Sequence, residues 1–392
     1  MQLFPLQNSI ADVPGFFCNG VKAGLKKDDF DVGFIYSDTL CDVAAIFTTN
    51  RFQAAPLRHF QKHAITQTNF ILANSKNANA MTGEAGIEDI EEILGELGKK
   101  FSLHNPIMSS TGVIGVRLPK QKIIDAALQF DLNTKNDEAF ARSIMTTDTF
   151  DKRLGFEVVL EDGKSFRIAG VAKGAGMIDP AMATMLCFIV TDADIPPRDM
   201  QELLRTTAET TFNAISVDGD RSTNDSVFLL ANKRSGTYDK EAFAFALKRI
   251  MHELALLIVK DGEGATKLVG FEIRGAKTKE EAKKAAKALT NSLLVKTALF
   301  GEDPNWGRIA AIIGASGVEC DEKSLRIWFE DVLVYDQGAI YFDQEQEQRA
   351  HEVMKRSEFS IICDLGMGDA SFKAYGCDLG YEYVKINAEY RT

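Results

Sequence analysis

The sequence lacks the features that would indicate a disulfide framework, a zinc site or a membrane span. Its six cysteines are scattered with no C-x-x-C pair, and its five histidines do not supply the missing ligands, whereas such sites need closely grouped residues. The longest apolar runs, such as 185–190 and 254–259, are far too short to cross a bilayer. The first residues lack the basic start and apolar core of a signal peptide. We therefore expect free, buried thiols in a cytoplasmic protein with no metal and no membrane partner.

An excess of positive charge is also missing. The 392 residues carry 56 acidic and 45 basic side chains, which gives a formal net charge of -11. An acidic surface repels phosphate backbones, so nucleic acid is not an expected partner. The hydrophobic fraction of 45% is ordinary for a globular protein, and a chain of this length suggests two or three domain-sized units. These features favour chemistry on small molecules.

Hydrophobic periodicity predicts both helices and strands. The predicted helices cover 84–101, 120–130, 198–213, 239–260 and a segment that begins at Thr278 with a capping-box glutamate three residues on. The predicted strands cover 156–160, 166–172, 185–191, 226–231, 268–274, 325–335, 359–364 and 381–386. Several strands follow one another without a helix between them. This order favours an α/β (α+β) fold of layered sheets flanked by helices over a doubly wound parallel sheet. The Gly- and Pro-containing stretch 301–317 is a candidate linker.

The most unusual segment is 171–193, VAKGAGMIDPAMATMLCFIVTDA. Glycines and a proline precede Ala183 and Thr184, and an apolar, strand-like run begins at Met185. A flexible loop that ends abruptly at a strand suits the holding of one side chain in a strained, exposed position. Taken alone, the pattern favours a threonine that merely begins a buried strand, because Ala-Thr-Met is an unremarkable sequence.

This segment resembles the self-processing site of the ornithine acetyltransferase (glutamate N-acetyltransferase) family of arginine biosynthesis. The resemblance recurs, in the family's order, over most of the chain, in 109–115 (SSTGVIG), 145–149 (MTTDT), 216–232 (SVDGDRSTNDSVFLLAN), 261–267 (DGEGATK), 301–308 (GEDPNWGR) and the C-terminus from Asp364 to Thr392. One glycine-rich motif would be weak evidence of membership in a family. Seven segments that occur in the same order as in the family are strong evidence of it.

The resemblance implies an N-terminal-nucleophile-like fold that cleaves itself between Ala183 and Thr184. An α chain of 1–183 and a β chain of 184–392 would result, the latter with a C-terminal subdomain from about 300. The Thr184 hydroxyl would attack the Ala183 carbonyl, and hydrolysis of the resulting ester would free the Thr184 amine. This amine, with a reference pKa of roughly 7.7–8.0, could then serve as the base for its own hydroxyl. Family members assemble from two copies of each fragment.

The resemblance also assigns the site. Thr184 is the nucleophile, and Thr111 with Gly112 is the oxyanion pair, for which a hydroxyl and an unobstructed backbone N–H are suitable donors. The substrate contacts that it implies are Thr147, Lys173, Thr184, Glu263, Asn387 and Thr392. Lys173 suits a carboxylate and Glu263 an ammonium group.

The expected reaction moves acetyl from N-acetylornithine to glutamate through acetyl-Thr184, without a cofactor. The sequence leaves open whether acetyl-CoA also serves as a donor, and how one pocket accepts both ornithine and glutamate. Two alternatives are a self-cleaving amidase or aminopeptidase, which would pass the acyl group to water, and a non-catalytic binding protein. The acidic turn that starts at Asp218 lacks the glycine and glutamate of a calcium loop, and no glycine-rich stretch completes a phosphate loop.

Overall fold

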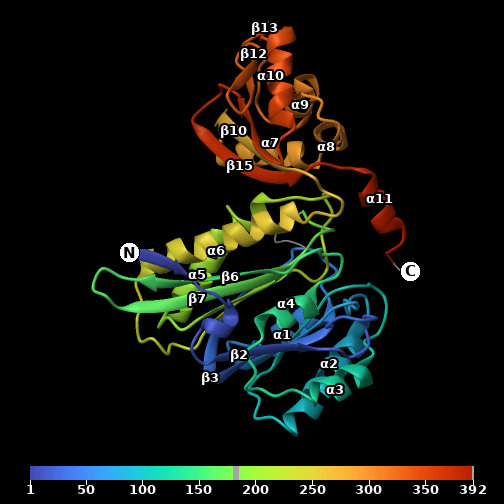
Figure 1. The fold of residues 1–392 in the computed structure, drawn as a ribbon, viewed down its shortest axis with the longest axis vertical. Helices are drawn as coiled ribbons and strands as arrows, with labels where there is room; N and C mark the ends of the chain where they lie inside the picture. Colours follow the sequence, from blue (N-terminus) through green and yellow to red (C-terminus); the bar gives the residue numbers. More distant parts are fainter. Residues whose placement is uncertain (180–184, 391–392) are drawn as a thin grey trace. The chain divides into compact units, whose positions relative to one another are not determined.

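The computed structural model describes residues 1–179 and 185–390, and these residues form two compact units (Figure 1). The first unit comprises 1–174, 185–212 and 221–254, and the second comprises 175–179, 213–220 and 255–390. Each unit has its own sheet, and α6 (Lys240–Lys260) has residues in both units. The predicted residues Ala183, Thr184 and Thr392 lie outside the described residues.

A nine-stranded sheet forms the framework of the described part of the first unit. Along the sheet the order is β1-β6-β7-β8-β9-β3-β4-β5, and β2 pairs with β3. The pairs β8–β9 and β4–β5 are parallel, and the other pairs are antiparallel. The strands are β1 (Gln2–Pro5), β2 (Phe16–Val21), β3 (Val32–Phe47), β4 (Gln67–Asn74), β5 (Ile107–Ser110), β6 (Lys152–Val159), β7 (Ser165–Lys173), β8 (Leu186–Thr191) and β9 (Ser226–Ala231).

Apolar side chains are buried on both faces of this sheet, as the alternation of side chains along a strand requires. On β4, Phe70 and Leu72 pack with α2 (Gly83–Gly98) and α3 (Lys120–Ala127), whereas Ile71 and Ala73 belong to a second cluster with α4 (Asp137–Ile144). The remaining helices of this unit are α1 (Ala55–Lys62), α5 (Pro197–Ala208) and the first part of α6 (Lys240–Lys260).

The second unit contains a six-stranded sheet in the order β13-β12-β11-β14-β10-β15. Its core gathers Phe271 and Ile361 from the sheet with Ala285 and Leu289 of α7. The strands are β10 (Leu268–Ala276), β11 (Arg326–Phe329), β12 (Val332–Asp336), β13 (Ala339–Ile340), β14 (Glu358–Asp364) and β15 (Ala370–Cys377), and the helices are α7 (Lys279–Asn291), α8 (Leu293–Phe300), α9 (Trp306–Ala315), α10 (Gln344–Met354) and α11 (Tyr381–Ala388). Short 3-10 turns occur at Ile10–Asp12 and Phe212–Ala214.

The predicted class is confirmed: mixed sheets are flanked by helices. All five predicted helices are present, and at the start of α7 the Thr278 hydroxyl accepts a hydrogen bond from the Glu281 N–H, 3.1 Å away. The predicted strand at 325–335 is a hairpin of two strands, β11 and β12. The candidate linker at 301–317 is wrong, because α9 occupies it. None of the helices among the described residues combines the length and hydropathy that a membrane crossing requires.

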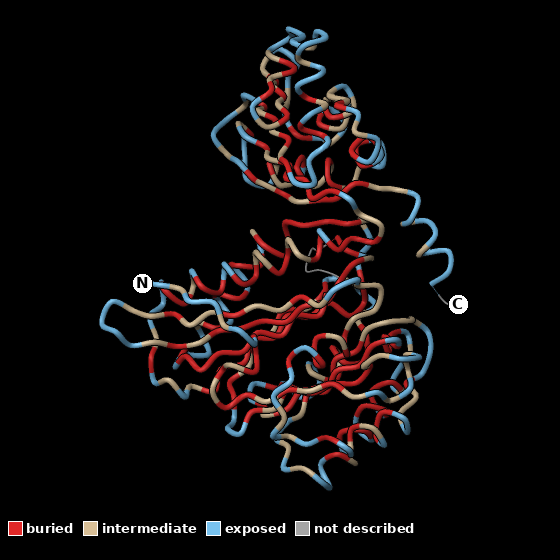
Figure 2. Tube along the Cα trace, viewed as in Figure 1, coloured by how far each residue is buried: buried red, intermediate tan, exposed pale blue. Residues whose placement is uncertain are grey.

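The predicted strand at 381–386 is also wrong, because these residues form the helix α11. Alternating aromatic and β-branched residues raise strand propensity, but such propensity is a weak prior that tertiary contacts override. The helix is largely exposed (Figure 2), with Tyr381 84% and Val384 66% accessible. Two side chains hold it to its own unit: the Tyr383 hydroxyl donates to Asp218, and the Asn387 amide donates to Glu263.

Candidate active site

The predicted site residues fall in both units. Thr111, Gly112, Thr147 and Lys173 belong to the first unit, and Glu263 and Asn387 belong to the second. Each set is described within its own unit.

The predicted oxyanion pair lies in a tight turn directly after β5. The Thr111 N–H donates to the Asn74 carbonyl at 3.0 Å, and the Val113 N–H donates to the Lys76 carbonyl at 3.2 Å. Between these two bonded amides, the Gly112 N–H donates to no acceptor among the described residues. Gly112 has φ of +134°, and a Cβ there would lie 2.2 Å from the Lys76 carbonyl carbon. The backbone contact and the positive φ both exclude any side chain larger than that of glycine.

The Thr111 side chain is also unengaged. Thr111 is half-buried, and its hydroxyl has no hydrogen-bond partner in the part of the chain that the structure describes. A free hydroxyl and a free backbone N–H therefore belong to consecutive residues. Two such donors can stabilise the negative charge that develops on a carbonyl oxygen during acyl transfer.

The buried side chains of Asn224 and Asn74 form hydrogen bonds that hold this turn in place. The Asn224 side-chain amide, in the loop before β9, donates to the Ser110 carbonyl at 2.8 Å and to the Ala78 carbonyl at 2.6 Å. The Ser110 hydroxyl donates to Asn74 Oδ1 at 2.7 Å. These buried residues tie the end of β5 to the loop after β4. No motif in the sequence predicts this role of Asn224, and the available signal is its place in a run of small polar residues immediately before an apolar strand.

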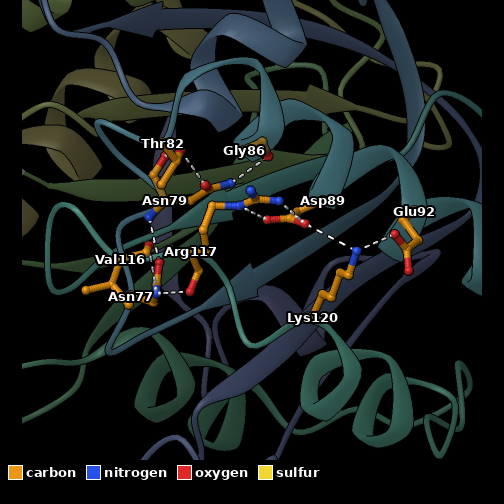
Figure 3. Close-up of polar contacts among 9 residues, drawn as sticks. All are labelled: Asn77, Asn79, Thr82, Gly86, Asp89, Glu92, Val116, Arg117 and Lys120. Atoms are coloured by element: carbon orange, nitrogen blue, oxygen red, sulfur yellow. Dashed lines mark hydrogen bonds and ion pairs between the residues drawn. The ribbon is translucent and has the colours of Figure 1, made fainter.

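A second layer of polar contacts surrounds the same loop (Figure 3). The Asn77 amide donates to the carbonyls of Val116 and Arg117, at 3.2 and 3.0 Å, and Asn77 Oδ1 accepts from the Asn79 N–H at 2.8 Å. The Arg117 guanidinium makes a two-bond contact with the buried Asp89 carboxylate, at 2.6 and 2.7 Å. Such paired, charge-assisted bonds fix direction as well as distance. The loop that carries the two free donors is thus anchored to α2.

Lys173 lies in a buried charge cluster at the end of β7. Its ammonium donates to the Thr146 hydroxyl at 2.7 Å and lies 3.7 Å from Asp148 Oδ2, while Lys152 Nζ lies 2.8 Å from Asp148 Oδ1. The Gly174 N–H also donates to Asp148, at 2.6 Å. Burial alone would raise the pKa of Asp148, but the two ammonium groups outweigh burial and hold this pKa well below its usual range. One carboxylate therefore positions the Lys173 ammonium.

The adjacent Thr147 is half-buried, and its hydroxyl has no hydrogen-bond partner among the residues described. The structure thus places two predicted substrate residues, Thr147 and Lys173, beside one carboxylate, that of Asp148. An ammonium has three N–H donors, so Lys173 can still donate to a ligand. The MTTDT segment contains Asp148, but no pattern in the sequence marks this aspartate as a functional residue.

Asp225 is a further buried group that sequence analysis missed. Both of its carboxylate oxygens lack a hydrogen-bond partner in the described parts of the chain. Burial raises its pKa well above the usual range. The next residue, Ser226, donates its N–H to the Met185 carbonyl at 3.0 Å, so Asp225 lies beside the beginning of β8. A buried carboxyl group with a raised pKa is therefore present next to Met185, the residue that follows Thr184.

In the second unit, the structure brings Glu263 and Asn387 together. The Asn387 amide donates to Glu263 Oε2 at 2.6 Å, and the Glu263 N–H donates to the Ala175 carbonyl at 2.9 Å. A Cβ added to Gly176 would lie 2.4 Å from the Glu263 carboxylate. The carboxylate is therefore packed directly over this glycine, which leaves room for it.

Asp218 holds the residues that follow. Its carboxylate accepts hydrogen bonds from the N–H groups of Met177 and Ile178, at 2.6 and 2.8 Å, and from the Tyr383 hydroxyl at 3.2 Å. The stretch 175–178, which precedes the predicted cleavage site, is thus fixed to the second unit at Glu263 and at Asp218.

Comparisons with known proteins show the family of this chain. A sequence model of the ArgJ family matches residues 17–392. The "Arginine biosynthesis bifunctional protein ArgJ" of Wolinella succinogenes is 60% identical, over 100% of this chain and 99% of its own length. The "Glutamate N-acetyltransferase" of Methanopyrus kandleri is 44% identical, over 94% of this chain and 97% of its own. A crystal structure of an ArgJ protein from Bacillus halodurans is 38% identical and covers 51% of this chain and 97% of its own, with a TM-score of 0.48. The chain belongs to the ArgJ family.

Proposed function

We propose that this protein is a glutamate N-acetyltransferase that moves acetyl from N-acetylornithine to glutamate through acetyl-Thr184. The observation that carries the proposal is the turn at Thr111 and Gly112, which offers an unengaged hydroxyl and an unengaged N–H. Membership of the ArgJ family and the names of the relatives support the same reaction. Acyl transfer needs such donors, because charge develops on the carbonyl oxygen at every step.

The first step of the proposal is self-cleavage. The Thr184 oxygen attacks the Ala183 carbonyl carbon, the peptide C–N bond breaks, and the departing nitrogen takes a proton. Water then hydrolyses the ester, which leaves a carboxylate on Ala183 and a free amine on Thr184. The anchoring of 175–178 at Glu263 and Asp218 supports this step, because fixed positions of reacting groups favour an intramolecular reaction and these residues precede the cleavage site in the sequence.

The second step is ping-pong transfer. The Thr184 amine takes the proton of its own hydroxyl, whose oxygen attacks the acetyl carbonyl of N-acetylornithine. The amide C–N bond breaks, and ornithine leaves with the proton. The glutamate amine then attacks acetyl-Thr184, so that N-acetylglutamate forms and the Thr184 hydroxyl is restored.

The substrate contacts are proposals as well. Lys173 and Thr147 present an ammonium and a hydroxyl that can bind a carboxylate, and Glu263 presents a carboxylate that Asn387 orients and that can bind an ammonium. Thr392 is retained as a sixth contact on resemblance alone. We also propose acetyl-CoA as a second donor, cytoplasmic location, and assembly from two copies of each fragment. Release of free thiol from acetyl-CoA in the presence of glutamate tests the second donor.

The acceptor distinguishes the proposal from an amidase. A transferase converts N-acetylornithine to ornithine at a rate that depends on glutamate, and it yields one N-acetylglutamate per ornithine. Ornithine release that is equally fast without glutamate, with acetate as the co-product, would show hydrolysis instead. Chromatography of both products from one reaction measures the ratio directly.

Replacing Thr111 with valine is expected to lower kcat by about 10²–10³, the usual cost of one lost oxyanion donor. Because the hydroxyl has no partner among the described residues, the thermal midpoint should not change. Thr134→Val is the matched control, since Thr134 is likewise half-buried without a described hydroxyl partner. Steady-state kinetics and thermal unfolding check both statements, and an unchanged kcat would remove Thr111 from the site.

Replacing Glu263 with glutamine is expected to raise the KM for N-acetylornithine about tenfold to a hundredfold, the cost of a lost charged hydrogen bond. The glutamine oxygen can still accept from Asn387, so the loop should keep its structure. Glu272→Gln, which alters a β10 carboxylate of the same unit, should leave the KM as it is. An unchanged KM in the Glu263 variant would exclude this residue from substrate binding.

A further inference from the structure

Three metal-ligating side chains that the proposed acetyl transfer does not use lie close together. His59 belongs to α1, His63 is the residue that follows this helix, and Glu91 belongs to α2. One ligand atom from each of the three lies within 4.8 Å of the other two. The spacing of the five histidines does not predict this site in the sequence. The third ligand, Glu91, comes from another helix rather than from a residue that neighbours the histidines.

The helix spacing explains why the two histidines meet. Side chains four residues apart lie on the same face of a helix, and the ring centroids of His59 and His63 are 4.5 Å apart. His63 Nε2 lies 3.4 Å from Glu91 Oε1. In a tetrahedral zinc site, with ligand bonds of about 2.1 Å, neighbouring ligand atoms are about 3.4 Å apart. The His63–Glu91 pair thus already has the spacing of two ligands of one metal ion.

The chemistry of the three groups is also suitable. His59 is buried, at 6% accessible, and its ring has no hydrogen bond to any described residue. Two imidazoles and a carboxylate are the donor set of many sites with three protein ligands, in which water completes the coordination.

Space for that fourth ligand is present. The three side chains border a pocket of about 320 Å³, which Leu94 and Asn105 also line. Because both histidines and Glu91 line the pocket, a water molecule or a small anion held in it can reach the metal. Lys62 at present neutralises Glu91, with Nζ 3.0 Å from Oε1. A bound cation would take over this role and displace the ammonium.

We propose that His59, His63 and Glu91 bind one divalent transition-metal ion, Zn²⁺ in the first instance, with an open fourth position that faces the pocket. The ion would join the end of α1 to α2. This site lies outside the residues of the proposed acetyl transfer, so either proposal can fail without the other.

The test is a zinc titration of the full chain, produced without a histidine tag, stripped with a chelator and desalted. A chromophoric chelator that competes with the protein for Zn²⁺ reports the fraction of zinc that the protein binds. We expect one equivalent of Zn²⁺ with a Kd of about 10 µM or tighter. His63→Ala and Glu91→Gln should each weaken binding at least about tenfold. These side chains are 45% and 42% accessible, so their replacement should not disturb the fold.

Two further variants sharpen the result. Lys62→Met should tighten binding by up to about fivefold, because it removes the competing cation. His104→Ala, which removes an exposed histidine of the same unit, should bind as the wild type does. Co²⁺ in place of Zn²⁺ should give the visible absorption of a four-coordinate ion, and this absorption should vanish in the His63 variant. Lack of binding at millimolar zinc, or binding by the His63→Ala and Glu91→Gln variants as tight as that of the wild type, would overturn the proposal.

Discussion

Replacing Thr184 with alanine is expected to leave one uncut chain of 392 residues that transfers no acetyl group. The variant lacks the hydroxyl that attacks the Ala183 carbonyl, so neither the cut nor the new amine can form. It also lacks the oxygen that would carry the acetyl group. Loss of a nucleophile typically costs about 10⁴-fold or more in rate, so transfer should fall to the background of the assay.

Intact mass under denaturing conditions measures the cut. The wild type should give two fragments, of 183 residues and the remaining 209, and Thr184→Ala should give one species. Thr184→Ser is the control, because it keeps a hydroxyl while it loses the methyl group that restricts χ1; it should be cut, but more slowly. An intact wild-type chain that transfers acetyl would exclude the amine of Thr184 as the base.

Local patterns predicted much of the fold. The helix at 239–260 has a long apolar stripe, and the helix from Thr278 has a capping residue. Both signals involve residues that are close together in the sequence, so they can be recognised without the tertiary structure. The same holds for the buried strand β8, whose six residues are all buried. The segment 381–386 failed because its strand propensity is local, whereas the contacts of Tyr383 and Asn387 that hold it as a helix are not.

The candidate site could be predicted only in part, for the same reason. Thr111 and Gly112 were found through resemblance, and the backbone contact of Gly112 with Lys76 gives the glycine a physical cause. The partners that hold the site come from distant segments. Asn224 reaches back 114 residues to Ser110, and no periodicity or spacing in a single sequence records such a pairing.

The charge cluster at β7 is the clearest such case, because neither Asp148 nor Lys152 has any pattern that marks it as buried. Asp148→Asn is expected to lower the free energy of unfolding of the first unit by about 3–5 kcal/mol, the usual cost of breaking a buried ion pair. The variant leaves the ammonium groups of Lys173 and Lys152 without their shared carboxylate. Urea unfolding followed by amide hydrogen exchange in β6 and β7 measures the loss.

The free energy of unfolding that is lost in Asp148→Asn should become smaller at acidic pH. The pKa of Asp148 is lowered in the folded protein, while in the unfolded chain it should be near the reference value of about 3.9. The carboxylate therefore contributes stability that is fully present above about pH 4 and is lost as the pH falls through the lower, folded value. The difference between wild type and Asp148→Asn should accordingly be constant near neutrality and shrink below about pH 4.

A matched control separates burial from mere pairing. Asp162 also pairs with a lysine, Lys164, at 2.9 Å, but this pair is exposed, and ion pairs in water contribute little. Asp162→Asn should therefore unfold almost as the wild type does. If Asp148→Asn were equally harmless, Lys173 would have to be held by other groups. If it were harmful to the same degree at every pH, the lost stability would come from packing rather than from the charge of the carboxylate.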